Sequence, residues 1–202
     1  GRNGRIIPHD VSSAAAAGTN APAFSAFPSI DYAQFGPVDA QPLTKIKKVT
    51  AKNLQRNWSN IPQVTQFDEA DITELEQFRL QYKTRAEKAG YRLTLLPLVM
   101  KAAVAALQRY PACNASLSSD GEQLIVKRYF HIGVAVDTPN GLVVPVIRDV
   151  DQKNLFVLAE ELHLISKKAR EKGLTPAEMQ GSTFTISSLG GIGGTSFTPI
   201  VN

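Results

Sequence analysis

The sequence is short of cysteine and of long apolar runs. Its single cysteine, Cys113, has no partner for an internal disulfide and cannot build a cysteine-rich zinc site, so we expect a reducing compartment. The longest uncharged apolar run extends from Leu93 to Met100 and includes Thr94 and Pro97. A membrane-spanning helix needs about 20 predominantly apolar residues. The sequence therefore predicts no transmembrane span.

A strong excess of one charge is also missing. The 202 residues carry 22 Lys+Arg and 18 Asp+Glu, which gives a net charge of +4. Such a mild excess permits anionic ligands but does not by itself indicate nucleic-acid binding. Hydrophobic residues make up 43% and charged residues 20% of the chain. These fractions are typical of a folded globular protein rather than a disordered one.

Composition divides the chain into three parts. Residues 12–30 contain no charged side chain and are rich in Ala, Pro, Ser and Thr, which is typical of a mobile linker. Residues 1–11 form a short segment before this linker. Structured sequence is expected from residue 31 to residue 202.

Hydrophobic periodicity predicts an α/β protein. Helices are expected over residues 43–58, 73–89, 94–110 and 155–172, with a short helix from residue 175. Alternating apolar and polar residues predict strands over residues 61–68, 129–137, 142–147 and 183–188. Turn signals at residues 120–121 and 138–141 indicate two hairpins. Thr73 and Glu76 match a capping box at the start of the second helix. Helices that alternate with hairpins predict a mixed β-sheet flanked by helices.

The histidines and the cysteine give little sign of catalysis. None of His9, His131 and His163 has a carboxylate placed in sequence as an orienting partner, so each is interpreted as a structural or surface residue. No His-x-x-x-His or His/Cys cluster is present, so we expect no metal. Cys113 follows Pro111 without a nearby base, which favours a structural thiol over a nucleophile.

A glycine-rich loop follows the last predicted strand. Gly190, Gly191, Gly193 and Gly194 lack the third glycine of a dinucleotide fingerprint, because position 196 is Ser, and no Gly-Lys-Ser/Thr occurs. The loop is either a flexible turn or a place where the backbone approaches a ligand. Ser187 and Ser188 end the strand before it. No Gly-x-Ser-x-Gly elbow surrounds them, so a serine hydrolase is not expected.

Five cations and no acid lie between Asp39 and Asp68. The cations are Lys45, Lys47, Lys48, Lys52 and Arg56. They form either a solvated helix face or a surface for an anionic ligand or partner. A nucleic-acid-binding module is disfavoured because no set of aromatic stacking residues accompanies the charge.

Three long stretches, in the same order, resemble the catalytic domain of the dihydrolipoyl acyltransferase components of 2-oxo acid dehydrogenase complexes. They are Ile61-Pro62-Gln63-Val64-Thr65-Gln66-Phe67-Asp68 with Asp71-Ile72-Thr73, the run from His131 to Val146, and the run from Phe184 to Asn202. The resemblance covers residues 31–202. Ser187-Ser188, where other relatives usually carry Ser-Asn, resembles the acetyl-transferring bacterial pyruvate type. Residues 1–11 resemble the tail of the peripheral subunit-binding domain of these chains.

The resemblance implies a fold and an activity. The fold is a chloramphenicol-acetyltransferase-like two-layer sandwich that forms a homotrimer, and trimers assemble into a larger cubic core. The activity is acetyl transfer between the dihydrolipoyl group and coenzyme A, with the lipoyl group carried on a domain absent from this chain. The implied partners are the pyruvate dehydrogenase and dihydrolipoyl dehydrogenase components, in a bacterial cytoplasm, without metal, nucleic acid or membrane. Ser187 takes the place of the hydroxyl that stabilises the oxyanion, while the coenzyme A contacts stay unassigned.

The sequence departs from the family at one motif above all. The catalytic His-x-x-x-Asp-Gly, which lies near the end of the family's domain, is absent here, and Gln63 stands where many relatives have His. We therefore expect a catalytic domain that is incomplete at its C-terminus and lacks its own base. Such a domain should expose a strand edge and apolar surface. The alternative function is that of a non-catalytic oligomeric scaffold fragment.

Overall fold

The computed structural model describes residues 29–191 and 193–201. The predicted binding-domain tail, residues 1–11, and nearly all of the predicted linker, residues 12–30, lie outside the described residues. The chain divides into two compact units, Gly1–Pro42 and Leu43–Asn202. In the described part of the first unit, a 3₁₀ turn, η2 (Tyr32–Phe35), begins where the Asp31 carboxylate accepts a hydrogen bond from Ala33 N at 3.1 Å.

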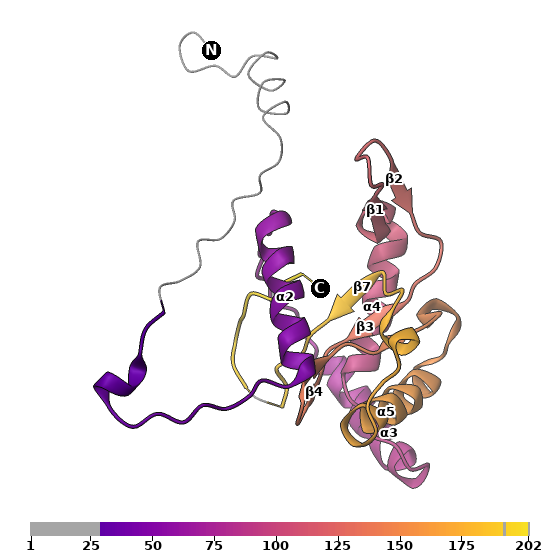
Figure 1. The fold of residues 1–202 in the computed structure, drawn as a ribbon. Coiled ribbons are helices and arrows are strands. Elements are labelled where there is room, and N and C mark those ends of the chain that lie inside the picture. The colour runs from indigo at the N-terminus through magenta and orange to yellow at the C-terminus, as the bar shows by residue number, and fades with distance from the viewer. Residues whose placement is uncertain (1–28, 192, 202) are drawn as a thin grey trace. The chain divides into compact units, whose positions relative to one another are not determined.

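A three-stranded mixed sheet forms the centre of the second unit (Figure 1). Its middle strand, β3 (Ile132–Val134), pairs antiparallel with β6 (Val146–Ile147) and parallel with β7 (Phe184–Ile186). All three residues of β3 are buried, as expected for a strand with neighbours on both sides. The mixed sheet flanked by helices that the sequence predicts is thus confirmed.

Two helices pack against this sheet, α4 (Leu96–Arg109) and α5 (Leu155–Glu171). The buried side chains of α4 recur every three or four residues, and those of α5 share one face, so each helix turns one apolar stripe inward. Together with the strands they form the main core, which consists of Met100, Val104, Leu107, Ile132, Val134, Ile147, Val150, Leu158 and Leu162. Full burial of one such side chain contributes about 1.5–3 kcal/mol to stability. The core therefore ties the helices to the sheet.

Helix α3 (Thr73–Lys88) contributes a smaller apolar cluster. Its Ala86 is fully buried with Leu93 and Ala159, and the rings of Tyr82 and Phe156 lie 5.6 Å apart beside them. The chain reverses at Gly90, whose φ of 90° is favourable only for glycine. The predicted helix and its stop are both confirmed.

Two hairpins complete the strands. The first pairs β1 (Ala115–Leu117) with β2 (Leu124–Val126), and the second pairs β4 (Val136–Thr138) with β5 (Gly141–Val143). Short 3₁₀ turns connect several elements: η3 (Pro111–Asn114), η4 (Val150–Gln152) and η5 (Pro176–Met179). Both hairpins lie where the turn residues predict them.

Helix α2 (Lys45–Asn60) lies on the second hairpin. Its N-cap, Thr44, accepts a hydrogen bond from Lys47 N at 3.3 Å and donates one to Asn140 O at 2.9 Å. One hydroxyl therefore caps the helix and fastens it to the β4–β5 turn. None of the helices in the two described ranges is long and apolar enough to cross a bilayer.

The prediction of a strand over residues 61–68 is wrong. The segment is extended but belongs to no sheet, and side chains rather than a backbone ladder connect it to the C-terminal segment. Gln63 Oε1 accepts from Val201 N at 3.3 Å, and Thr65 Oγ1 bonds Thr198 Oγ1 at 3.4 Å. Apolar and polar residues do alternate, but Gln63 and Thr65 are half-buried while Val64 is 84% exposed.

The capping box predicted at Thr73 is also wrong. Thr73 donates from both its backbone N and its Oγ1 to Asp71 Oδ1, at 2.9 and 2.6 Å, so its oxygen caps no helix amide. Glu76 instead binds Arg79 in a bidentate ion pair. A capping box does form between Thr175 and Glu178 at the start of η5.

Candidate functional site

Ser187 follows the last hydrogen-bonded residue of β7. The strand is fixed along its length, because Thr183 N donates to His131 O at 2.7 Å and Ala135 N donates to Ile186 O at 2.9 Å. Ser187 is the next residue after Ile186 and is exposed. A rigid strand therefore sets the position of its backbone, while its side chain is accessible.

The two serines at this strand end have different roles. Ser188 Oγ accepts a hydrogen bond from Gly190 N at 3.2 Å and so shapes the turn that follows. In the described part of the chain, no hydrogen bond engages Ser187 Oγ. Of the two, Ser187 has the hydroxyl that is free to serve a ligand.

The glycine-rich loop folds back on itself after Ser188. Gly193 N donates to Leu189 O at 2.8 Å, and Gly193 and Gly194 have φ values of 89° and 120°. Residues other than glycine rarely adopt these backbone angles. The loop is thus a turn built on glycine, and both interpretations of its sequence stay open.

A groove of about 600 Å³ lies between the segment after α2 and the C-terminal segment. Its walls are residues 62–68 and residues 195–201, apart from Thr198 and Ile200. Both walls belong to stretches that carry the family resemblance, but the groove itself was not predicted. No local spacing signals it, because its walls are about 130 residues apart. Ser187 does not line it.

Gln63 is the most constrained polar residue of this groove. Its Oε1 accepts from Val201 N, which joins the two walls, while its Nε2 is buried without a partner in the described structure. A buried amide donor without an acceptor is unfavourable by about 1–3 kcal/mol. Gln63 therefore fastens the groove but leaves one donor unsatisfied.

His131 lies beside Asp149. Its Nδ1 accepts a hydrogen bond from the backbone N of Asp149 at 3.0 Å and lies 3.6 Å from Asp149 Oδ1, so the main chain and not the carboxylate orients the ring. Because Nδ1 accepts, the neutral ring carries its proton on Nε2. Asp149 has a φ of 47°. The contact fastens the start of β3 to a left-handed turn, which is a structural role.

The remaining sequence candidates are not brought together. His163 lies within α5, and His9 lies outside the described residues. Cys113 is exposed in η3, which differs from the packed structural thiol that the sequence favours. Across residues 29–191 and 193–201, no group of three or more His, Cys, Asp or Glu is placed to hold a metal ion.

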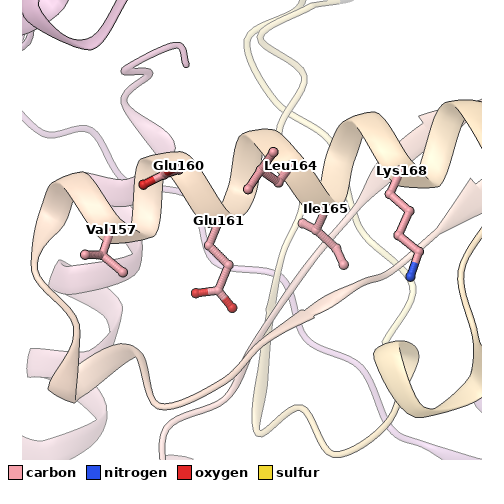
Figure 2. Close-up of a pocket in the computed structure, with 6 residues that line it drawn as sticks. All are labelled: Val157, Glu160, Glu161, Leu164, Ile165 and Lys168. Atoms are coloured by element: carbon pink, nitrogen blue, oxygen red, sulfur yellow. The ribbon is translucent and has the colours of Figure 1, made fainter. Parts of the chain in front are cut away.

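A second hollow, of about 310 Å³, runs along α5 (Figure 2). All six lining side chains come from this one helix: Val157, Glu160, Glu161, Leu164, Ile165 and Lys168. Two of its charges are already paired, because Glu161 binds Lys153 and Lys168 binds Glu178, each at 2.6 Å. The hollow holds no nucleophile beside a base. Ser187 and the groove remain the better candidates.

Known proteins are similar to this chain over most of its length. Residues 36–202 match the family described as 2-oxoacid dehydrogenases acyltransferase (catalytic domain). A relative from Cupriavidus necator, the dihydrolipoyllysine-residue acetyltransferase component of pyruvate dehydrogenase complex, is 53% identical over 176 residues, which cover 87% of this chain. They cover 32% of that relative. The chain spans between 27% and 39% of the length of the first three relatives.

Two solved structures share the fold with a TM-score of 0.84 and 55% sequence identity, over 86% of this chain and 72% of each of theirs. One is the cubic core of the pyruvate dehydrogenase multienzyme complex. The other is that of Azotobacter vinelandii dihydrolipoamide acetyltransferase, from work on the role of a serine, a histidine and an asparagine in its catalytic mechanism. The predicted fold is confirmed by both.

Proposed function

The chain belongs to the acyltransferase family of the 2-oxoacid dehydrogenases, and we propose that it transfers an acetyl group between a dihydrolipoyl thiol and coenzyme A. The observation that carries this proposal is Ser187, an exposed serine with an uncommitted hydroxyl at the end of a fixed strand. A serine is also named in the mechanism of the Azotobacter relative. The acetyl specificity rests on the names of relatives that are about half identical to the chain.

Acyl transfer between two thiols passes through a tetrahedral intermediate. The attacking sulfur forms a bond to the carbonyl carbon, and the oxygen of that carbonyl becomes an oxyanion until the other sulfur leaves. We assign Ser187 Oγ–H as a donor to this oxyanion. Removal of one such donor lowers kcat by about 100- to 1000-fold in enzymes where it has been tested.

The attacking thiol needs a base. A free thiol has a pKa of about 8.5, so it is mostly protonated at neutral pH. The resemblance to the family implies a His-x-x-x-Asp-Gly motif as this base, and no such motif occurs in the given sequence. We assign the base neither to His131, whose Nδ1 is engaged by Asp149 N and whose ring fastens β3, nor to His163, which lies within α5.

The test is acetyl transfer from acetyl-CoA to dihydrolipoamide, measured with the protein as its organism produces it. Ser187→Ala should lower kcat on the order of 100-fold and leave both KM values nearly unchanged. Ser188→Ala is the matched control, because its hydroxyl shapes the turn, and it should stay within a few fold of the parent. An unchanged kcat in Ser187→Ala would exclude the oxyanion role.

A second function, that of an assembly scaffold, is favoured by the apolar surface of the second unit. Val64, Leu117 and Phe67 are 84%, 70% and 65% exposed. Isolated chains rarely leave so many large apolar side chains in water unless a partner covers them. We propose that copies form homotrimers that build a larger core, as in the similar cubic core, and that this core holds the pyruvate dehydrogenase and dihydrolipoyl dehydrogenase components in the bacterial cytoplasm. Assembly without acetyl transfer would favour this function alone.

A further inference from the structure

Helix α2 presents four cations along one side. Lys45, Lys48, Lys52 and Arg56, here called the cation stripe, are three or four residues apart and all exposed. Residues at this spacing lie on the same face of a helix. At 1.5 Å per residue the stripe is roughly 17 Å long.

The cation stripe lies opposite the face by which α2 packs. The half-buried residues of α2 are Ile46, Thr50, Leu54 and Asn57, which share the other side of the helix. Asn57 Nδ2 donates to Val201 O at 3.0 Å, and Ile46 lies against Gly141. The cations therefore point away from the fold that holds the helix.

The stripe is electrostatically unfavourable on its own. Lys48 and Lys52, and Lys52 and Arg56, are like charges at i,i+4, which destabilise a helix. α2 contains no acidic residue, and none of the four cations pairs with an acid in residues 29–191 and 193–201. An opposite charge from outside the described structure of one copy would relieve this repulsion.

The same chain carries an acidic segment of opposite charge. Residues 68–76, here called the acidic segment, contain Asp68, Glu69, Asp71, Glu74 and Glu76, with no base before Arg79. Asp71 is held by Thr73, and Glu76 by Arg79. Asp68, Glu69 and Glu74 are exposed, and within the described part of the molecule they form no ion pair.

We propose that the cation stripe of one copy docks on the acidic segment of a second copy. Each copy has both surfaces, so the contact is head-to-tail, and repetition of such a contact closes a ring when the rotation allows it. Each of the two charged surfaces has an exposed apolar side chain beside it. Val49, next to the cation stripe, is 50% exposed, and Phe67, next to the acidic segment, is 65% exposed. The charges fix partner and orientation, while the apolar contacts add affinity.

Charge reversal tests this docking. Lys48→Glu/Lys52→Glu should weaken self-association at least tenfold at low salt, as measured by sedimentation. The four-fold variant Lys48→Glu/Lys52→Glu/Asp68→Lys/Glu69→Lys should regain self-association, because the exchanged positions again carry opposite charges, and should co-assemble poorly with the parent chain, where the exchanged positions meet like charges. Arg92→Glu/Lys167→Glu changes the net charge equally at exposed sites elsewhere and is the matched control.

The outcomes separate this inference from the proposed function on which its assembly step rests. Self-association of Lys48→Glu/Lys52→Glu equal to that of the control overturns the docking. Failure of the four-fold variant to recover, with a circular dichroism spectrum like the parent's, also overturns it, as does a parent chain that is monomeric at every salt concentration. If Lys48→Glu/Lys52→Glu raises the KM for coenzyme A and leaves assembly unchanged, the stripe serves an anionic substrate and the proposal fails. None of these results changes the effect of Ser187→Ala on kcat.

Discussion

Gly133 on β3 lies so close to Thr185 on β7 that a Cβ atom at position 133 would be 3.0 Å from Thr185 Oγ1. The same atom would be 2.9 Å from Val144 Cγ1 and 3.3 Å from Ser182 Cβ. Real Cβ atoms essentially never come within 3.0 Å of a neighbour. The absence of a side chain at Gly133 thus permits the strand pairing that ends at Ser187.

Gly133→Ala should therefore loosen the central sheet. The added methyl group must displace neighbours on several sides, and overpacking of this kind lowers the free energy of unfolding by about 1–3 kcal/mol. The measurement is denaturant unfolding. Gly191→Ala is the control, because nothing lies within 4 Å of its Cβ position. Equal stability of the two variants would show that the close approach at Gly133 relaxes freely.

Lys101 on α4 connects this helix to the turn before α5. Its Nζ donates to Val150 O at 3.0 Å, Asp151 O at 3.2 Å and Lys153 O at 3.0 Å. Lys101→Met keeps the apolar stem but leaves three carbonyls without this donor. The free energy of unfolding should fall by about 1–3 kcal/mol. Exposed Lys167→Met should have almost no effect in the same denaturant titration, and a matching loss there would contradict the interpretation.

How much of this fold the sequence predicts depends on whether the signal is local. α5 is predictable because Leu158 and Leu162 repeat at helical spacing, and the first hairpin because Asp120-Gly121 favours a turn. Residues 61–68 mislead because alternation reports extended backbone but not whether a neighbouring strand pairs with it. Thr73 and Thr175 each stand three residues before a glutamate at the start of a helical segment, but only the second forms a capping box, since the hydroxyl of Thr73 donates to Asp71.

The site depends on contacts that local patterns do not contain. Resemblance to a family singles out Ser187, yet only the structure separates it from Ser188, whose hydroxyl serves the turn. His131 and Asp149 are 18 residues apart, so no spacing rule predicts their hydrogen bond. The groove beside Gln63 lies between residues 62–68 and residues 195–201, so no local pattern predicts it either.

Asn114 is a buried polar residue whose amide connects two backbone carbonyls. It is 1% exposed, and its Nδ2 donates to Lys127 O at 2.9 Å and to Tyr129 O at 3.1 Å. Asn114→Asp keeps the shape but turns a carboxylate toward these two acceptors. An uncompensated buried charge of this kind should lower the free energy of unfolding by about 3–5 kcal/mol at pH 7.

Acid should partly rescue this variant. Once protonated, the carboxyl group introduced by Asn114→Asp can donate to one of the two carbonyls, so the stability deficit relative to the parent should shrink as the pH falls. The measurement is thermal unfolding of both proteins from pH 7 to pH 4. Asn140→Asp, at an exposed turn position, is the control and should show no such trend. A deficit that stays constant with pH would show that lost packing, not buried charge, causes it.

Glu178 supplies an acid-sensitive contact between α5 and η5. Its side chain accepts from Lys168 Nζ at 2.6 Å and from Thr175 N and Oγ1 at 2.8 Å. The hydrogen bond from Lys168, followed by those from Thr175, lowers the pKa of Glu178 from 4.5 to about 2. Because the folded pKa lies below the unfolded one, this contribution is fully present above about pH 4.5 and is lost as the pH falls toward 2.

Glu178→Gln should therefore be less stable than the parent at pH 6, and the difference should disappear between pH 4.5 and pH 2. The amide cannot act as a charged acceptor for Lys168, so the variant lacks the titrating contribution at every pH. Thermal unfolding across this range gives the comparison, with exposed Glu171→Gln as the control. A difference between parent and Glu178→Gln that persists to pH 2 would mean that shape and neutral hydrogen bonds, rather than the ionised carboxylate, hold η5 against α5.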